Sequence, residues 1–200
     1  MSKIVVMNHV TLDGVMQGPG RADEDTRDGF RHSGWGERTA SPPDGALQKA
    51  MGDSMVAGGG LTGWLFGRRT YCDLLDYWNR QRDSPFGPML NDTPKYVAST
   101  TLTEPLPWPN STLLRGDVPG AVATLKTQSE GVLAVTGSGD LIGSLAAADL
   151  IDEFLLMIHP LVLGSGRRLF PDGVEVALRL VNGTTSSTGV VIATYAPTWD

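Results

Sequence analysis

The chain has 200 residues, a formal net charge of −6 and 40% hydrophobic residues, which is enough apolar material for one core, so a single domain over residues 1–200 is expected. The acidic balance without a basic run argues against a nucleic-acid partner, and the lack of a long apolar run or leader segment predicts a cytoplasmic protein with no membrane partner. One cysteine and three histidines without zinc-type spacing predict neither a metal site nor an internal disulfide.

The first half of the chain alternates apolar runs with polar loops. Residues 3–10 are apolar and β-branched and predict a central strand, which leads into a long loop at 11–36 rich in glycine, aspartate and arginine. Loops of this length in a compact domain are usually functional. We then expect a short helix over 44–51 and a strand ending at Gly67. A helix starting near Arg68 follows, because four apolar residues recur at helical spacing, namely Tyr71, Leu74, Leu75 and Trp78.

The second half repeats strand and helix units. Strands are expected over 95–100, 111–116, 132–136 and 154–163, the last broken at Pro160, with a terminal antiparallel hairpin of 175–182 and 190–196. A short helix is expected over 88–91. A second helix is capped by Asp117 and closed by Gly131. A third helix carries an apolar stripe of Leu141, Leu145 and Ala148.

This order of elements predicts the fold class. Alternating strands and helices, with strands apolar on both faces, are typical of an α/β protein with a mainly parallel sheet covered on both sides. Ligands of such sheets bind beyond the carboxyl ends of the strands. Three segments are expected at that position: the loop after the first strand, "GRRT" at 67–70 and "TGSGD" at 136–140.

The segment "GRRT" has the chemistry of an anion site. Gly67 lets a ligand approach the backbone, and the first turn of the following helix offers free N–H groups. Arg68 and Arg69 add forked, permanently charged donors, and Thr70 adds a hydroxyl. The alternative is that the two arginines form an ordinary solvated helix face.

The other two segments are weaker signals taken alone. A strand that ends in "TGSGD" and opens into a helix can hold a pyrophosphate on its backbone amides, and ordinary strand-to-helix turns look the same. The hydroxyls of Ser99 and Thr100 can bind a ribose or its phosphate, although these residue types also fill plain turns. Together the segments suit an extended dinucleotide, with arginines that would select a 2′-phosphate.

Five stretches resemble one known family: "VVMNHVTLDGVMQGPG", "WLFGRRTYCDLLDYW", "YVAST", "LAVTGSGDLIGSL" and "IHPLVLGSGRRLFPDG". They are similar, in order and over nearly the whole chain, to the dihydrofolate reductase-like family that includes the reductase domain of riboflavin-biosynthesis enzymes. The resemblance implies a dihydrofolate reductase-type three-layer sandwich with a C-terminal antiparallel hairpin, NADPH as cofactor, and a homodimer. For the riboflavin enzymes it implies 5-amino-6-(5-phosphoribosylamino)uracil reductase activity.

The resemblance also implies roles for individual residues. The 2′-phosphate side of the adenosine would be bound by Arg68, Arg69, Thr70, Ser99 and Thr100. The pyrophosphate would lie on Gly137, Ser138, Gly139, Asp140 and Leu141. The loop that closes over the nicotinamide would comprise Thr11, Leu12, Asp13 and Gly14.

Substrate and catalytic residues are sought in the long loop and nearby helix. Asp13 is the best-placed carboxylate, either orienting substrate or relaying a proton, although Asp-Gly is also a standard turn. Aromatic walls of a substrate pocket could come from Phe30, His32, Trp35 and Trp78, although Trp78 also completes a core stripe and the loop aromatics could anchor the loop. His9 and His159 lie in apolar strands and are interpreted as hydrogen-bonded core histidines.

The resulting hypothesis is an NADPH-dependent oxidoreductase. It would reduce a small heteroaromatic molecule, similar to a pterin or a riboflavin precursor, by direct hydride transfer. The alternative from another class is a non-catalytic NADP-binding regulatory or sensor module. A third interpretation, an anion-binding structural domain, predicts no discrimination between NADPH and free phosphate.

Overall fold

The computed structural model describes residues 1–39 and 45–198. These residues form two compact units: the first comprises residues 1–5 and 55–151, and the second comprises residues 6–54 and 152–200. The helices and strands, in chain order, are β1 (Lys3–Thr11), α1 (Ala46–Ala57), β2 (Leu61–Gly67), α2 (Arg68–Arg80), α3 (Phe86–Asp92), β3 (Lys95–Ala98), β4 (Ser111–Leu114), α4 (Val118–Gln128), β5 (Val132–Thr136), α5 (Gly139–Ala146), β6 (Glu153–His159), β7 (Leu178–Thr185) and β8 (Val191–Pro197). The single domain expected over the whole chain stays a prediction.

The strands are hydrogen-bonded in the order β4-β3-β2-β5-β1-β6-β8-β7. β2, β3, β4 and β5 pair in parallel, whereas β6, β7 and β8 pair antiparallel. The predicted α/β class, with a mostly parallel sheet and a C-terminal antiparallel hairpin, is confirmed.

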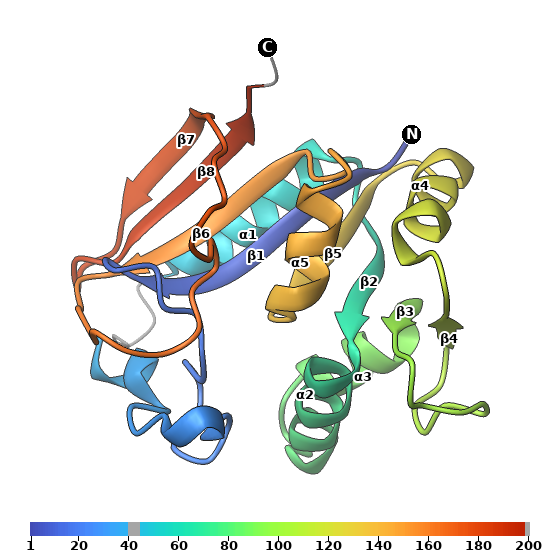
Figure 1. Cartoon of the computed structure of the whole chain (residues 1–200), viewed down its shortest axis with the longest axis horizontal. Helices are drawn as coiled ribbons and strands as arrows, with labels where there is room; N and C mark the ends of the chain where they lie inside the picture. The colour runs from blue at the N-terminus through green and yellow to red at the C-terminus, as the bar shows by residue number, and fades with distance from the viewer. Residues whose placement is uncertain (40–44, 199–200) are drawn as a thin grey trace. The chain divides into compact units, whose positions relative to one another are not determined.

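The first unit is built on the parallel strands. β2 carries buried Trp64, Leu65 and Phe66, and β5 is buried from Val132 to Val135, so both strands are apolar on both faces, as parallel strands covered by helices require. β2 leads directly into α2 (Figure 1). The predicted buried face of α2 is confirmed in part, because Tyr71 and Leu75 are buried whereas Leu74 and Trp78 are half-buried.

Two helix ends in this unit differ from the prediction. Asp117 caps α4 as expected, accepting a hydrogen bond from the Gly120 N–H at 3.0 Å, but the helix ends at Gln128, with Ser129 and not Gly131 as its C-cap. Gly131 has φ +120° and lies against the chain before β2: a Cβ atom there would be 2.7 Å from the Gly60 carbonyl oxygen. Its glycine is therefore required by this close approach, and not by a helix end.

The other two predicted helices also differ in detail. α5 ends at Ala146, so Ala148 is exposed beyond it, and Ile142 is buried in its place. α1 runs to Ala57 and buries none of its described side chains, which makes it longer than the range 44–51 predicted from apolar spacing. Asp44, the predicted start of this helix, lies outside the described residues.

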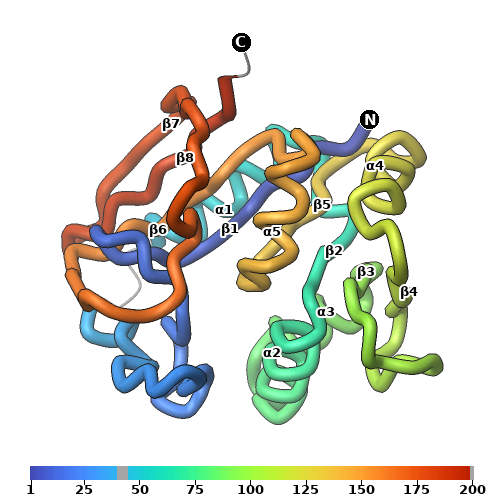
Figure 2. The backbone as a smooth tube through the Cα atoms, in the orientation of Figure 1, coloured from blue at the N-terminus to red at the C-terminus, as the bar shows by residue number. Residues whose placement is uncertain are grey.

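The second unit contains the antiparallel strands. β6 is buried from Phe154 to Met157 and ends at His159. The predicted break at Pro160 is confirmed, whereas the predicted continuation of the strand to residue 163 is wrong. β7 and β8 form the terminal hairpin, which Figure 2 shows as two adjacent traces. β7 has an irregular register between Leu180 and Asn182 and is exposed from residue 179 to 185. This strand is the edge of the sheet, and only β8 pairs with it.

Candidate functional site

Three predicted segments follow strands that end at the same edge of the first unit. β2 lies between β3 and β5, with Gly67 opposite Ala98 and Leu65 opposite Val135. The ends of these parallel strands are thus adjacent, and they are followed by residues 67–70, 99–100 and 136–141. The segments "GRRT" and "TGSGD" therefore follow neighbouring strands of this unit, as does the serine and threonine pair, and their joint role in binding a ligand stays a prediction.

The two arginines lie at the start of α2. Arg68 and Arg69 are exposed, and neither forms an ion pair with another residue of the described ranges 1–39 and 45–198. The first turn of α2 has no acidic residue, and no side chain caps it. Both arginines therefore lie in the first turn of α2, at the positive end of the helix, and no acidic residue of that turn neutralises them, which is the electrostatic setting of an anion site.

A pair of hydroxyl groups links the "GRRT" segment to the glycine turn. The Gly67 N–H donates to the Ser138 Oγ atom at 2.7 Å, and the Ser138 hydroxyl donates to the Thr70 Oγ1 atom at 2.9 Å. Thr70 and Ser138, which were assigned to different parts of a dinucleotide, contact each other directly. Sequence spacing could not reveal this contact, since the residues are 68 positions apart.

Glycines lie on both sides of this contact, and the positive φ of Gly137 favours glycine there. Gly137 has φ +58°, and a Cβ atom there would lie 2.9 Å from the Thr70 side chain; one on Gly67 would lie 3.2 Å from the Ser138 Oγ atom. Beyond the turn, Gly139 starts α5, Asp140 is exposed, and Leu141 is buried. Leu141 can therefore offer a ligand only its backbone.

The serine and threonine pair after β3 is engaged in a turn. The Ser99 Oγ atom accepts the N–H groups of Thr101 at 3.1 Å and Leu102 at 3.0 Å, and Thr100 is exposed. These contacts fit the alternative of a plain hydroxyl turn. A role in ribose or phosphate binding stays a prediction for both residues.

Asp13 is held by three donors in the second unit. Its carboxylate accepts the Thr11 hydroxyl at 2.5 Å, the Leu163 N–H at 3.2 Å and the Gly164 N–H at 2.8 Å. Burial raises the pKa of Asp13, but the hydrogen bonds outweigh this effect and hold the pKa below its usual value. Asp13 is therefore an ionised carboxylate that ties the Thr11–Gly14 turn to the segment after β6. At neutral pH its carboxylate carries no proton to donate, because the three donors stabilise the charged form.

The remaining residues of this turn support the same geometry. Thr11 is buried and also accepts the Val15 N–H through its hydroxyl at 3.0 Å, while Gly14 has φ +80° and its N–H donates to the Thr11 carbonyl at 2.9 Å. Leu12 is 65% exposed. It is the one residue of the predicted nicotinamide loop whose side chain projects into solvent.

We expect the substitution Asp13→Asn to lower the free energy of unfolding by about 1–3 kcal/mol, because an amide cannot accept all three hydrogen bonds and places an NH₂ group beside a backbone N–H. Chemical denaturation measures this change. Asp53→Asn, on the exposed surface of α1, is the control and should change stability by less than ~0.5 kcal/mol. An unchanged stability in Asp13→Asn would show that the carboxylate does not hold the two segments together.

The loop aromatics point inward. Trp35 is fully buried and its indole N–H donates to the Gln17 carbonyl at 2.7 Å; Phe30 is 6% exposed and packs with Val15 and Trp35. His32 lies edge-on to Phe30, with ring centroids 5.6 Å apart. These contacts fit the alternative stated for the loop aromatics, which is that they anchor the loop, and they leave no exposed face on Trp35 for a substrate.

His9 and His159 are hydrogen-bonded core histidines, as predicted. The His9 Nδ1 and His159 Nε2 atoms are 2.8 Å apart, and His159 Nδ1 also contacts the Thr39 hydroxyl. The edge of the Trp35 ring packs on His159. The pKa of each imidazole is lowered to about 4, by burial for His159 and by burial together with repulsion from His159 for His9.

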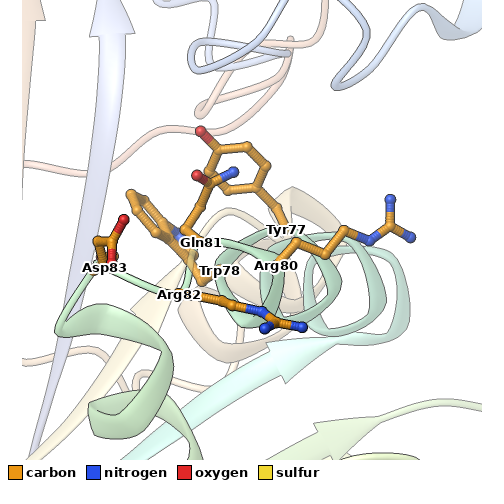
Figure 3. Close-up of a pocket in the computed structure, with 7 residues that line it drawn as sticks. Tyr77, Trp78, Arg80, Gln81, Arg82 and Asp83 are labelled. Atoms are coloured by element: carbon orange, nitrogen blue, oxygen red, sulfur yellow. The ribbon is translucent and has the colours of Figure 1, made fainter.

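Trp78 lies at the opposite end of α2 from Arg68, about 15 Å along the helix axis. Its ring packs against Phe86, with centroids 4.9 Å apart. It also lines an open surface hollow of about 520 Å³ formed by residues 77, 78 and 80–84 (Figure 3). The predicted role of Trp78 in a substrate pocket stays a prediction.

Comparison with known proteins identifies the family. The RibD C-terminal domain model matches residues 2–192. This chain belongs to the RibD C-terminal domain family. Among curated relatives, the uncharacterized protein YyaP of Bacillus subtilis (strain 168) is 32% identical over 138 residues, which cover 66% of this chain and 71% of that protein.

Solved structures share the fold of this RibD C-terminal domain protein. A protein assigned to riboflavin biosynthesis from Shewanella sp. PV-4 has a TM-score of 0.72 at 22% identity, with all of both chains covered. A pyrimidine reductase-like protein from Corynebacterium diphtheriae has a TM-score of 0.62 at 11% identity, covering 100% of this chain and 93% of the other. Dihydrofolate reductase from Enterococcus faecalis, in complex with NADP(H), has a TM-score of 0.56 at 14% identity, covering 98% and 96%.

The family and the fold together suggest a reductase of the dihydrofolate reductase-like or RibD type. Within residues 1–39 and 45–198, no group of three or more histidine, cysteine, aspartate or glutamate side chains could hold a metal ion. No helix in the same ranges is both long and apolar enough to cross a bilayer.

Proposed function

We propose that this protein is an NADPH-dependent reductase of a small heteroaromatic substrate. The observation that carries the proposal is the edge of the first unit, where two exposed arginines, without ion-pair partners in the part of the chain that the structure describes, follow β2 beside the glycine turn that follows β5. Membership of the RibD C-terminal domain family supports a reductase. The NADP(H) bound to the similarly folded dihydrofolate reductase supports the choice of cofactor.

The residues at this edge fit a phosphorylated dinucleotide. Arg68 and Arg69 would hold the 2′-phosphate, since a guanidinium fork matches phosphate oxygens. The backbone of residues 137–141 would hold the pyrophosphate, because Gly137 presents no side chain and α5 begins at Gly139, so this segment is the N-terminal end of a helix. When bound, the cofactor supplies the hydride; the protein binds and orients both reactants.

In the second unit, the Thr11–Gly14 turn is proposed to contact the nicotinamide, as the family resemblance implies. The chain's own contribution there is a fixed turn, since Asp13 and the Thr11 hydroxyl hold each other and the backbone around them. We assign Asp13 to positioning of this turn. Its three hydrogen bonds are made by the ionised carboxylate, which accepts protons in hydrogen bonds and does not donate one.

The substrate class rests on the named relatives. One is assigned to riboflavin biosynthesis, one is pyrimidine reductase-like and one is a dihydrofolate reductase, so the proposed substrate is a pyrimidine or pterin ring of the kind found in riboflavin precursors. Steady oxidation of NADPH by the purified protein, dependent on an added compound of this class, measures the activity.

The cofactor assignment is tested by titrating the protein with NADPH and with NADH while following tryptophan fluorescence. We expect NADPH to bind more tightly, and Arg68→Ala to lose about 10–100-fold of NADPH affinity with little change for NADH, as the loss of a charge-assisted hydrogen bond predicts. Arg80→Ala, at the other end of α2 and paired with Asp76, is the matched control and should keep the preference. Equal binding of both nucleotides by the parent protein would overturn the 2′-phosphate assignment.

A second candidate function is a non-catalytic NADP-binding sensor or regulatory module. The observation that favours it is that Asp13 and Trp35, both predicted to act on a substrate, are fully engaged in contacts within the protein. Selective NADPH binding without oxidation by any pyrimidine or pterin compound would support this candidate. Substrate-dependent turnover would exclude it.

The proposal includes a homodimer and a cytoplasmic location. The open edge of β7, with exposed Leu180 and Val181, supports a sheet that continues into a second copy by antiparallel pairing about a two-fold axis. The mass in solution tests it, and a monomer at micromolar concentration would contradict it.

A further inference from the structure

Two successive hydrogen bonds run in one direction, from the Gly67 N–H through the Ser138 hydroxyl to the Thr70 hydroxyl. The Gly67 N–H donates to Ser138 Oγ, and Ser138 in turn donates its only hydroxyl proton to Thr70 Oγ1, at 2.7 and 2.9 Å. Thr70 is the last acceptor of this series, so neither of the two hydrogen bonds involves the hydroxyl proton of Thr70. Successive hydrogen bonds of one direction polarise each other. The two hydrogen bonds therefore make the hydroxyl proton of Thr70 more acidic.

The backbone conformation of Ser138 is unfavourable for a residue that carries a side chain. Ser138 has φ 58° and ψ 53°, in the left-handed region, which is strained for a residue with a Cβ atom and unstrained for glycine. The preceding Gly137 has the same φ without that strain. A glycine at position 138 would adopt the turn more easily, so the two hydrogen bonds of the serine hydroxyl are the compensating interaction.

The surrounding atoms keep the three residues together. Side chains at positions 67 and 137 would push the turn away, since their Cβ atoms would lie 3.2 Å from Ser138 Oγ and 2.9 Å from Thr70. Both glycines thus permit the approach on which the hydrogen bonds depend. The start of α2 and the turn before α5 are joined as one structure by these contacts.

We propose that Ser138 is a positioning residue that orients and polarises the Thr70 hydroxyl for donation to a phosphate oxygen of the bound nucleotide. This inference rests on the proposed NADPH-binding function and deepens it. Ser138 itself then acts through Thr70, instead of contacting the ligand by its hydroxyl. The phosphate is either the 2′-phosphate beside Arg68 or the pyrophosphate beside Gly137, since Thr70 adjoins both segments.

The test is a double-mutant cycle on NADPH affinity with Ser138→Gly and Thr70→Val. Ser138→Gly removes the hydroxyl and relaxes the backbone, and Thr70→Val replaces the hydroxyl by a methyl group of similar size. We expect each single variant to weaken NADPH binding about 5–10-fold, and Ser138→Gly to have less than a ~2-fold effect in the Thr70→Val background. Thr70→Ser keeps the hydroxyl and should restore most of the affinity, which a purely structural role of the threonine methyl group would not allow.

Parallel titrations with NADH distinguish the two phosphates. If Thr70 donates to the 2′-phosphate, the Thr70→Val effect is confined to NADPH; if it donates to the pyrophosphate, both nucleotides lose affinity equally. Multiplicative effects of the two substitutions would overturn the inference, because Ser138 would then act independently of Thr70. Failure of the proposed function gives a different result, namely a parent protein that binds no nucleotide. Thermal melting of each variant confirms that it is folded at the titration temperature.

Discussion

Trp35→Ala should lower the free energy of unfolding by about 3–5 kcal/mol, the largest single-residue effect that we expect on stability. The indole is fully buried, its N–H donates to the Gln17 carbonyl, and its ring edge packs on His159. Truncation removes the packing of a large side chain and leaves that carbonyl without its donor. Urea denaturation followed by circular dichroism measures the change.

Trp78→Ala is the matched control, since this half-buried tryptophan lines an open surface hollow. Its loss should cost no more than ~1–2 kcal/mol, because a partly exposed ring buries less apolar area. If Trp35→Ala lowers the free energy of unfolding by less than Trp78→Ala does, Trp35 does not anchor the loop. A wall of the substrate pocket is then the better interpretation of Trp35.

Acidification from pH 6.5 to pH 4 should destabilise the protein through the pair of His9 and His159. Burial lowers the pKa of each imidazole to about 4, against 6.5 for an ordinary histidine. Between these values the unfolded chain binds protons that the native protein does not, so stability falls as the pH falls. The loss is full below pH 4 and absent above pH 6.5, and a shift of this size corresponds to about 3 kcal/mol for one histidine.

Thermal melting between pH 7 and pH 4 measures this dependence. His9→Gln removes one titrating ring while keeping a side chain that can bond to His159, and it should flatten the slope of melting temperature against pH. His32→Gln is the control, because His32 lies outside the pair. An unchanged slope in His9→Gln would show that acid sensitivity arises elsewhere, for example from the carboxylates.

Local patterns predicted the elements around the candidate site with good accuracy. The start of α2 at Arg68 follows from the glycine that ends an apolar strand and from four apolar residues at helical spacing. The end of β6 before Pro160 follows from the missing N–H of proline. In both cases the decisive chemistry lies within a few residues of the boundary.

The prediction was poorer where contacts between distant segments decide the outcome. Gly131 was interpreted as a helix end, whereas the glycine is required by the approach of the chain at Gly60. Asp13 was interpreted as a candidate for chemistry because nothing near it in sequence shows that the N–H groups of Leu163 and Gly164 bind its carboxylate. The contact of Ser138 with Thr70 was missed for the same reason.

The irregular register of β7 bears on how far self-association could extend. The strand exposes seven consecutive residues and carries only one charged side chain, Arg179, so few charges oppose the addition of another strand. The irregularity between Leu180 and Asn182 interrupts the regular ladder near the middle of the strand, and such interruptions twist an edge away from flat stacking. When two β7 edges pair with each other, the β7 edge of each copy is hydrogen-bonded and cannot pair with a third copy. Association through β7 should therefore stop at two copies, without growth into fibres.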